Sequence, residues 1–365
     1  MGRRAVSRLF YYLSIALTAV LAVVTLAGAF ASQVSPNHSA LLPFIGLALP
    51  VLLLLNLAVA LYWTVRWRCW LFIPLIAILG NGGYLNRIFQ LPASPVVPVA
   101  GILTVATYNV DSFGREQSGM TCKDIAAYLK SQQADILCFQ EFGTNAVFTA
   151  DSVKAALADW PHSLIPYTPD SIPLLQLALF SRYPIRDSQL IAYPDSRNCS
   201  MWCDLEVNGK LLRVFNNHLQ TTEVTRNKSK LVKELHQELQ QDEIGAGTET
   251  AVLRLMDGLH QNFIRRASQA ETLQGLIGST PHPLLVCGDF NSLPSSYTYA
   301  TIKGSRLNDG FQTCGHGYMY TFHYFKHLLR IDYVLHTPDI EGIDYFSPEL
   351  EYSDHNPVVM RVRMK

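Results

Sequence analysis

Acidic side chains and lysines are missing from the first hundred residues of the chain. The charged residues there are six arginines, so this part is apolar and basic. The whole chain has 365 residues and a formal net charge of zero. The remaining 265 residues therefore hold 23 basic and 29 acidic side chains, a net charge of −6. A non-specific DNA-binding domain normally presents a basic surface to the phosphates, so this charge disfavours bulk DNA binding and leaves only a local basic patch open.

The sequence also lacks a Cys-x-x-Cys pair, and its seven cysteines have no spacing typical of a zinc site. Two pairs, Cys199 with Cys203 and Cys122 with Cys314, could form disulfides if the larger part of the chain lies in an oxidising compartment. Internal repeats and low-complexity segments are absent as well.

Three apolar runs follow one another in the amino-terminal part. Residues 10–31 and 41–63 are uncharged and long enough to cross a hydrocarbon layer of about 30 Å at about 1.5 Å per helical residue. Residues 69–79 form a shorter run, which needs residues 80–85 to complete a span. The first run could instead be a signal peptide, but its apolar core is longer than usual and a second long run follows it. The sequence therefore predicts two or three transmembrane helices, and an integral protein of the plasma or inner membrane.

Arginines set the expected orientation of these segments. Three precede the first run, and Arg66 and Arg68 lie between the second and third runs, whereas residues 32–40 carry none. Positively charged residues stay on the cytoplasmic side, so the amino end and the second loop are expected inside. With three spans everything after residue 91 emerges outside, and with two it stays in the cytoplasm. We predict three, with the larger part of the chain extracytoplasmic.

Three prolines mark the boundary between the apolar part and the globular part. Pro92, Pro95 and Pro98 make residues 92–100 a stiff, extended spacer. We therefore predict a membrane anchor over residues 1–91, a proline-rich linker over 92–100 and a globular domain over 101–365.

In the globular part, an apolar run at residues 284–287 enters the sequence Gly-Asp-Phe-Asn and reads as a buried strand with an abrupt end. If the extended geometry continues, Asp289 and Asn291 project to the same side. Gly, Asp and Asn are also turn formers, so these four residues alone favour a simple turn, and only the motifs spaced around them favour a catalytic pair. A phosphoryl centre under attack by water needs a carboxylate and an amide such as those of Asp289 and Asn291. The carboxylate orients the water, and the amide donates to the oxygen on which negative charge develops.

Two further predicted strands, at residues 102–110 and 136–139, also lead to polar side chains. The first carries Asn109 near its end, and the second runs into Glu141. A carboxylate just past an apolar strand suits a hard cation, because Mg²⁺ takes oxygen ligands and usually one or two carboxylates. For Glu141 alone, however, an ordinary solvated acid at a strand end is the preferred interpretation.

An acid interrupts another apolar strand, at residues 331–335. Asp332 would be costly to bury without a partner. A histidine is the natural partner, because a carboxylate on one ring nitrogen fixes the tautomer and raises the basicity of the other. His355 is the candidate, since it lies in a polar segment immediately before the last apolar run.

Six short motifs occur in the order and approximate spacing of one superfamily: TYNV at 107–110, QE at 140–141, NHL at 217–219, GDFN at 288–291, RIDY at 330–333 and SDHNP at 353–357. Together they resemble the endonuclease/exonuclease/phosphatase superfamily, which includes DNase I-like nucleases, neutral sphingomyelinases and inositol-polyphosphate phosphatases. The resemblance covers residues 101–365. With its apolar amino-terminal segments, the chain looks like the membrane-anchored bacterial members.

The resemblance implies an α/β fold, a four-layer αββα sandwich of two packed β-sheets, preceded here by transmembrane helices. The site would lie at one end, where the strand-end loops meet. It also implies a divalent metal, Mg²⁺ with Mn²⁺ as the alternative. By motif matching, Glu141 is the principal metal ligand, with Asn109 near it and Asp354 as a further contributor.

The same resemblance implies roles for the other polar residues. Asp289 and Asn291 would orient the attacking water and the phosphate. His218 and His355 would stabilise the pentavalent phosphorus or protonate the leaving oxygen, and Asp332 would hold His355. Whether Asp289 or His355 is the base stays open at this point.

These observations predict a membrane-anchored, metal-dependent phosphoesterase that hydrolyses a phosphodiester or phosphomonoester by direct attack of water. A lipid head group is the favoured substrate, because the anchor keeps the site near lipids and the domain is acidic. The alternative is a tethered Mg²⁺-dependent nuclease. A catalytically inactive scaffold is the third reading, which the complete set of motifs disfavours.

Overall fold

The computed structural model describes residues 3–91, 101–114, 119–144, 147–166, 176–194, 196–222 and 246–365. The predicted linker at residues 92–100 lies outside these ranges. Two long apolar helices open the chain, α1 (Arg3–Gly28) and α2 (Leu41–Val65). Both are long and apolar enough to cross a membrane, as the first two runs predict.

The third apolar run is not one straight helix. It forms a short 3-10 turn (Cys69–Leu71), α3 (Phe72–Gly80) and α4 (Gly82–Ile88), and the two parts are bent by 59°. Asn81 lies at the bend, where its Nδ2 donates to the carbonyl oxygens of Thr25 (2.9 Å) and Ala77 (3.0 Å). The predicted third span is therefore present only if the bent pair crosses as a unit.

In the described residues after 101, the strands form two six-stranded sheets. The first sheet has the order β10 (Asn308–Asp309), β12 (Asp332–His336), β9 (Leu284–Asp289), β8 (Lys210–His218), β7 (Cys199–Val207), β6 (Ile185–Ala192). The second has the order β13 (Ile340–Phe346), β14 (Val358–Met364), β2 (Leu103–Asn109), β3 (Ile136–Gln140), β5 (Ala178–Ser181), β4 (His162–Leu164). Pairs β8–β9 and β2–β3 are parallel, and the other pairs in both sheets are antiparallel.

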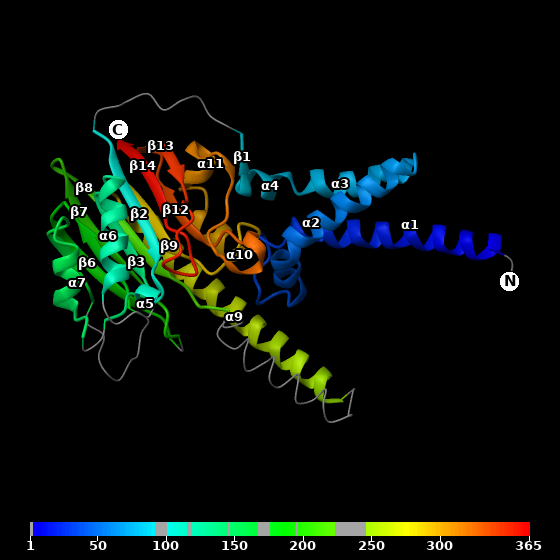
Figure 1. The fold of residues 1–365 in the computed structure, drawn as a ribbon, viewed down its shortest axis with the longest axis horizontal. Coiled ribbons are helices and arrows are strands. Elements are labelled where there is room, and N and C mark those ends of the chain that lie inside the picture. The colour runs from blue at the N-terminus through cyan, green and yellow to red at the C-terminus, as the bar shows by residue number, and fades with distance from the viewer. Residues whose placement is uncertain are drawn as a thin grey trace.

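Helices cover the outer faces of both sheets, so the architecture is the predicted four-layer sandwich (Figure 1). The helices of this part are α5 (Asp111–Gly114), α6 (Met120–Ser131), α7 (Ala150–Ala156), α9 (Ala246–Ser279), α10 (Tyr297–Lys303), α11 (Gly310–Cys314) and α12 (Tyr324–His327). On one side, α6 buries Cys122, Ile125 and Leu129 against the second sheet, at the helical spacing of three and four residues. On the other side, α9 and α10 pack against the first sheet through residues such as Leu273 and Ile302.

The central core lies between the sheets. Every residue of β2, β3 and β9 is buried, because strands covered on both faces present no side to water. The thiols of Cys122, Cys203 and Cys314 are free. The two disulfides considered from the sequence are therefore wrong. Cys199 and Cys203 lie four residues apart along the extended strand β7, and Cys122 of α6 is buried on the outer face of the second sheet, whereas Cys314 packs against the core between the sheets.

The amino-terminal helices are packed directly onto the sandwich (Figure 1). The Ser295 hydroxyl donates to the carbonyl of Gly46 in α2 (2.8 Å), and the Arg87 guanidinium of α4 donates to the carbonyl of Pro294 (2.7 Å). A short strand after α4, β1 (Phe89–Gln90), pairs with β11 (Gly317–Tyr318). The helices thus contact the same end of the sandwich at which β9 and β12 carry their polar residues.

Candidate active site

Strand register brings the polar residues of three neighbouring strands side by side. Asp289, the last residue of β9, is paired with Asp332 at the start of β12 and with His218 at the end of β8. In the second sheet, Asn109 at the end of β2 is paired with Gln140, the residue before Glu141. Because the two sheets are packed face to face, these strand ends meet at one rim.

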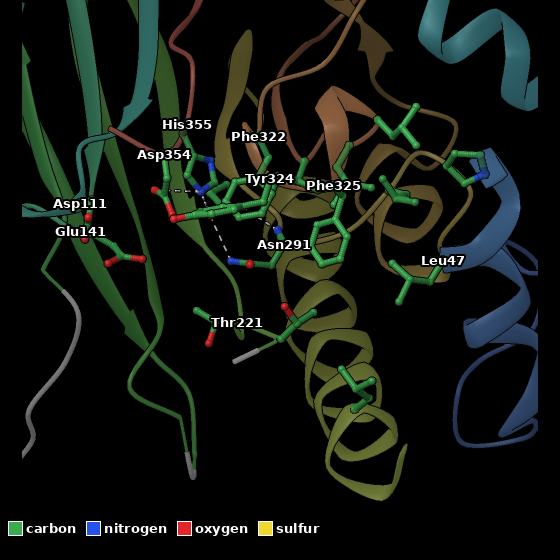
Figure 2. Close-up of a pocket in the computed structure, with 18 of the residues that line it drawn as sticks. Leu47, Asp111, Glu141, Thr221, Asn291, Phe322, Tyr324, Phe325, Asp354 and His355 are labelled. Carbon is green, nitrogen blue, oxygen red and sulfur yellow. Dashed lines mark hydrogen bonds and ion pairs between the residues drawn. The ribbon is translucent and has the colours of Figure 1, made fainter. Parts of the chain in front are cut away.

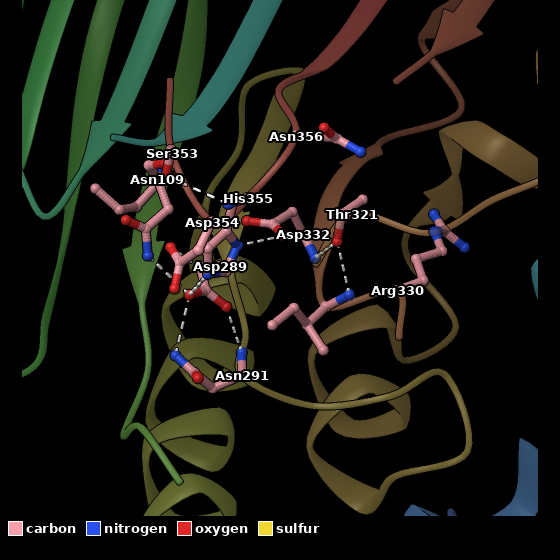
Figure 3. Close-up of polar contacts among 12 residues, drawn as sticks. Asn109, Asp289, Asn291, Thr321, Arg330, Asp332, Ser353, Asp354, His355 and Asn356 are labelled. Carbon is pink, nitrogen blue, oxygen red and sulfur yellow. Dashed lines mark hydrogen bonds and ion pairs between the residues drawn. The ribbon is translucent and has the colours of Figure 1, made fainter. Parts of the chain in front are cut away.

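The carboxylate oxygen Oδ2 of Asp289 lies at the centre of this group (Figure 3). It accepts hydrogen bonds from Asn109 Nδ2 and from Asn291 Nδ2, both at 3.1 Å. The ring nitrogen Nε2 of His218 lies 3.7 Å from it, and Nε2 of His355 lies 3.8 Å from it. Burial raises the pKa of Asp289 to about 6, the charge of the nearby Asp332 adds to this shift, and the two imidazoles oppose it.

Asn291 reaches Asp289 by a turn rather than by an extended strand. Its backbone φ is 48°, so the strand ends at Asp289 and the expectation of continued extended geometry is wrong. The Asp289 carboxylate accepts from the Asn291 backbone N–H (2.7 Å) as well as from its side chain, which is the local bonding that makes Asp a turn former. The two side chains therefore converge, as the sequence predicts, for a different geometric reason.

His355 is held by a buried carboxylate. Its Nδ1 lies 2.9 Å from Asp332 Oδ2, and both side chains are at most 6% exposed. Burial opposes the charge on the imidazole, but the carboxylates of Asp332 and Asp289 outweigh this effect and raise the pKa of His355 to about 10. The predicted partnership of Asp332 and His355 is thus present, and it leaves Nε2 of the ring directed to the site.

His218 is fully buried, and neither of its ring nitrogens has a hydrogen-bond partner among the described residues. Its Nε2 lies 3.6 Å from Glu141 Oε1 and 3.7 Å from Asp289 Oδ2. These distances are longer than a hydrogen bond. Because a buried polar group without a partner costs free energy, we expect a ligand atom to lie between these groups in the working enzyme.

The residues at this rim fit a hard divalent cation. Glu141 is partly exposed, and its Oε1 lies 3.4 Å from Nδ2 of the buried Asn109, so a carboxylate and a side-chain amide lie next to each other in the site. Oxygen donors of this kind suit Mg²⁺. A second group that could hold an ion consists of Asp289, Asp332 and His355. In that group the Nδ1 of His355 is already bonded to Asp332, so Glu141 and Asn109 are the better candidates.

A cavity of about 670 Å³ opens over these residues (Figure 2). Its polar lining consists of Asp111, Glu141, Thr221, Thr222, Asp289, Asn291, Asp354 and His355. Asp354, the third predicted metal ligand, lies at its rim with Oδ1 4.0 Å from His355 Nε2. Five of the eight predicted residues thus line one cavity, and Asn109, His218 and Asp332 contact this group from behind.

The backbone at the cavity is strained. Glu141, Asn291, Asp111 and Phe325 all have positive φ, between 38° and 56°. This conformation is uncommon for residues other than glycine and costs of the order of 1 kcal/mol or more. Such strain is typical of functional sites, where the surrounding structure holds side chains in positions that a relaxed strand or helix would not give.

Several residues of the cavity were not predicted from the sequence. The segment between β11 and β12 contributes Phe322, Tyr324, Phe325, Leu328 and Leu329, and α2 contributes Leu47, Pro50 and Val51. The aromatic residues clustered at 318–325 were the available signal for the first group. For the second group no signal exists, because α2 is apolar on all sides.

Thr321 links this segment to the site. Its hydroxyl accepts hydrogen bonds from the backbone N–H groups of Ile331 (3.0 Å) and Asp332 (3.1 Å). The next residue, Phe322, contacts His355, and the centroids of the two rings are 4.8 Å apart.

Solved structures share this fold. TDP2 from D. rerio, in a structure described as complexed with single strand DNA product, has a TM-score of 0.51 at 14% sequence identity, over 72% of this chain and 99% of that one. A humanized D. rerio TDP2 carrying 14 mutations has a TM-score of 0.50 at 15% identity, over 72% and 99% of the two chains. At these identities the likeness concerns the fold alone. No curated protein matches the chain significantly.

Sequence models of two families match the chain. A domain of unknown function (DUF8431) matches residues 8–88, the part that contains the apolar helices. The Endonuclease/Exonuclease/phosphatase family matches residues 106–355, more than half of the chain and the whole of the rim described above. The chain therefore belongs to the endonuclease/exonuclease/phosphatase family, and it is a metal-dependent hydrolase of ester bonds.

Proposed function

We propose that this protein is a membrane-anchored phosphoesterase that hydrolyses a phosphodiester or phosphomonoester of a lipid head group by direct attack of water. Residues 1–91 form the anchor and residues 101–365 the catalytic domain in this proposal. The observation that carries it is the convergence on Asp289 Oδ2: two amides donate to it, and two imidazoles lie within 3.8 Å. A centre of this kind can orient a water and stabilise charge on phosphoryl oxygens at the same time.

The proposed reaction is a single displacement at phosphorus. Asp289 orients the attacking water and takes its proton, and the amides of Asn109 and Asn291 keep its carboxylate in one orientation. The ester P–O bond opposite the water breaks as the new one forms. Glu141 and Asn109, with Asp354 at the rim, would hold a divalent cation, which would supply charge stabilisation at the phosphoryl oxygens when bound.

His355 and His218 face the charge that develops in this reaction. His355, positively charged beside Asp332, donates from Nε2 either to a phosphoryl oxygen or to the leaving oxygen. In the second case the leaving group departs with that proton. His218, whose ring nitrogens have no hydrogen-bond partner among the residues described, donates to the oxygen that lies between Glu141 and Asp289. Asp332 acts through His355 and is a positioning residue.

The lining of the cavity supports a lipid rather than a nucleic acid. Of the residues described, no lysine or arginine lines it, and apolar side chains form much of its wall. A nucleic-acid site needs basic groups along the phosphate backbone. The apolar wall instead matches the part of a lipid that adjoins its phosphoester.

The packing of the helices supports an extracytoplasmic catalytic domain. The first turns of α2 and the end of α4 contact the sandwich, whereas α1 begins at the end of the helices that is far from it (Figure 1). At that opposite end, Trp70 donates to the Tyr11 hydroxyl and Arg68 lies over the Tyr11 ring. Because arginines mark the cytoplasmic side, the bent pair α3–α4 crosses as the third span and the sandwich lies outside.

The test is hydrolysis of bis(para-nitrophenyl) phosphate in Mg²⁺ by the full-length chain and by Glu141→Gln. We expect the substitution to lower kcat/KM at least about a hundredfold and to weaken Mn²⁺ binding followed by electron paramagnetic resonance. Glu206→Gln is the matched control, because Glu206 is a partly exposed acid paired with Arg186 on the sheet surface. Wild-type rates in Glu141→Gln would show that the assignment is wrong.

A further inference from the structure

The cavity over the site is larger than a phosphoryl group requires. Its volume of about 670 Å³ lies in the range of pockets that enclose whole small ligands, about 300–1,000 Å³. One side of it is polar and carries the residues discussed above. The other side is apolar and is formed by Leu293, Phe322 and Leu329 of the sandwich together with Leu47 and Val51 of α2. Figure 2 shows His355 and Asp354 on one side of the cavity and Phe325 and Leu47 on the other.

The contribution of α2 to this wall is fixed by specific contacts. Ser295, four residues after Asn291, donates to the carbonyl of Gly46 at 2.8 Å. A side chain at Gly46 would lie 2.8 Å from the Cβ atom of Ala31, so glycine permits the close approach of α2 to the loop before it. Two residues before Gly46, Phe44 contacts Phe263 of α9 with ring centroids 5.3 Å apart. The position of Leu47 relative to Asn291 is therefore determined by packing on both sides.

The two faces of α2 have different partners. Leu49 and Leu53 are buried against α3 and α4, and Asn56 is buried against α1 through a hydrogen bond to Thr25. Leu47, Val51 and Leu54 follow at the spacing of one helical face, roughly opposite to the buried one. They are 37%, 49% and 52% exposed. An apolar stripe thus begins in the cavity and continues along a helix that is long enough to cross a membrane.

We propose that α2 is part of the substrate site, and that the stripe Leu47–Val51–Leu54 binds the alkyl chain of a membrane lipid whose phosphoester lies at Asp289. The inference rests on the proposed function and adds to it that the anchor selects the substrate as well as tethering the enzyme. An alkyl chain is the favoured occupant of the stripe, because the stripe is continuous with the bilayer at one end and with the catalytic residues at the other. A lipid can enter along α2 without leaving the membrane.

The test compares two phosphodiesters that share one reactive group, para-nitrophenyl methyl phosphate and para-nitrophenyl dodecyl phosphate. Full-length protein in a fixed concentration of detergent is assayed in Mg²⁺. Val51→Trp fills the stripe with an apolar side chain, so membrane insertion is preserved. Val23→Trp is the matched control, because Val23 is 66% exposed on α1 and does not line the cavity.

We expect wild type and Val23→Trp to prefer the dodecyl ester, since each buried CH₂ group contributes about a fourfold factor. Val51→Trp should lower the ratio of kcat/KM for the dodecyl ester to kcat/KM for the methyl ester by roughly tenfold or more, whereas Val23→Trp should keep the wild-type ratio. Hydrolysis of the methyl ester by Val51→Trp reports that the variant is folded. Equal ratios in the two Trp variants would overturn the inference and leave the proposed function standing.

Failure of the proposed function has a different signature. If wild type hydrolyses neither ester, the phosphoesterase assignment fails, and the stripe is then tested by equilibrium dialysis of dodecyl phosphate against the same detergent. Weaker binding by Val51→Trp than by Val23→Trp supports the alkyl-chain site. Equal binding by the two variants overturns it.

Discussion

Replacing Asp332 by Asn tests how the buried carboxylate acts on His355. The substitution keeps the size of the side chain and an oxygen that can accept from Nδ1, but it removes the negative charge 2.9 Å from the ring. Two unit charges at that distance attract each other by about 6 kcal/mol at an effective dielectric constant of about 20. Because the hydrogen bond survives in part, the expected net loss of transition-state stabilisation is about 3–5 kcal/mol. This loss corresponds to a decrease in kcat of roughly 10²–10⁴-fold.

The pH dependence separates this electrostatic role from a structural one. In the wild type the pKa of His355 is raised to about 10, because the carboxylates of Asp332 and Asp289 outweigh burial. The imidazole is therefore charged below that pH and loses its charge above it. Without Asp332 its pKa falls, so the alkaline limb of the kcat profile should move to lower pH. The assay is the initial rate of hydrolysis of bis(para-nitrophenyl) phosphate in Mg²⁺ across a neutral-to-alkaline buffer series.

The control is Asp344→Asn, which removes an ion-paired carboxylate on β13, outside the cavity lining. It should leave both the rate and the alkaline limb unchanged. Thermal unfolding of both variants reports whether a loss of rate reflects a loss of fold. An Asp332→Asn variant that keeps the wild-type kcat and the wild-type alkaline limb would refute the role of Asp332.

Two further predictions concern the anchor and its attachment. Arg330→Met should lower the free energy of unfolding, measured by chemical denaturation, by about 3–5 kcal/mol, because it leaves Asp309 buried without its charge partner. Adding Asp309→Asn should recover part of this loss. If the two substitutions had fully additive effects on the free energy of unfolding, the pairing would be contradicted. Cys69 is an exposed thiol in the loop after α2, so a membrane-impermeant maleimide should label it in inside-out vesicles. Labelling of Cys69 in intact cells would contradict the proposed orientation.

Apolar strands with polar ends could be predicted from the sequence, because a strand buried on both faces appears as an uninterrupted apolar run whose end is easy to locate. The runs that became β2, β3 and β9 contain no residue that a solvated face would require, and every one of their residues is buried. Their ends are marked by the first polar side chains, so Asn109, Glu141 and Asp289 could be assigned to one rim. The strand β6 was not predicted, since four of its eight residues are polar or charged and it forms a sheet edge.

The apolar half of the cavity could not be predicted, for two physical reasons. Leu47 lies more than two hundred residues before Asn291 in the chain, and only tertiary packing brings them together. In addition, α2 is apolar on every side, so periodicity does not distinguish the face that packs on α1 and α3 from the face that lines the site. Amphipathic patterns identify a buried face only where the other face meets water, and a helix in lipid has no such contrast.

Arg330 connects the amino-terminal helices with the strand that carries Asp332. Its guanidinium is fully buried, pairs with both carboxylate oxygens of Asp309 (2.8 and 2.6 Å), and donates to the carbonyl of Arg87 in α4 (2.8 Å). Two residues later, Asp332 holds His355. A buried guanidinium needs every one of these acceptors, since an unpaired charge in the interior is costly. A displacement of α4 would therefore disturb the start of β12, and with it the orientation of His355, so the packing makes the position of the amino-terminal helices a determinant of the geometry at the site.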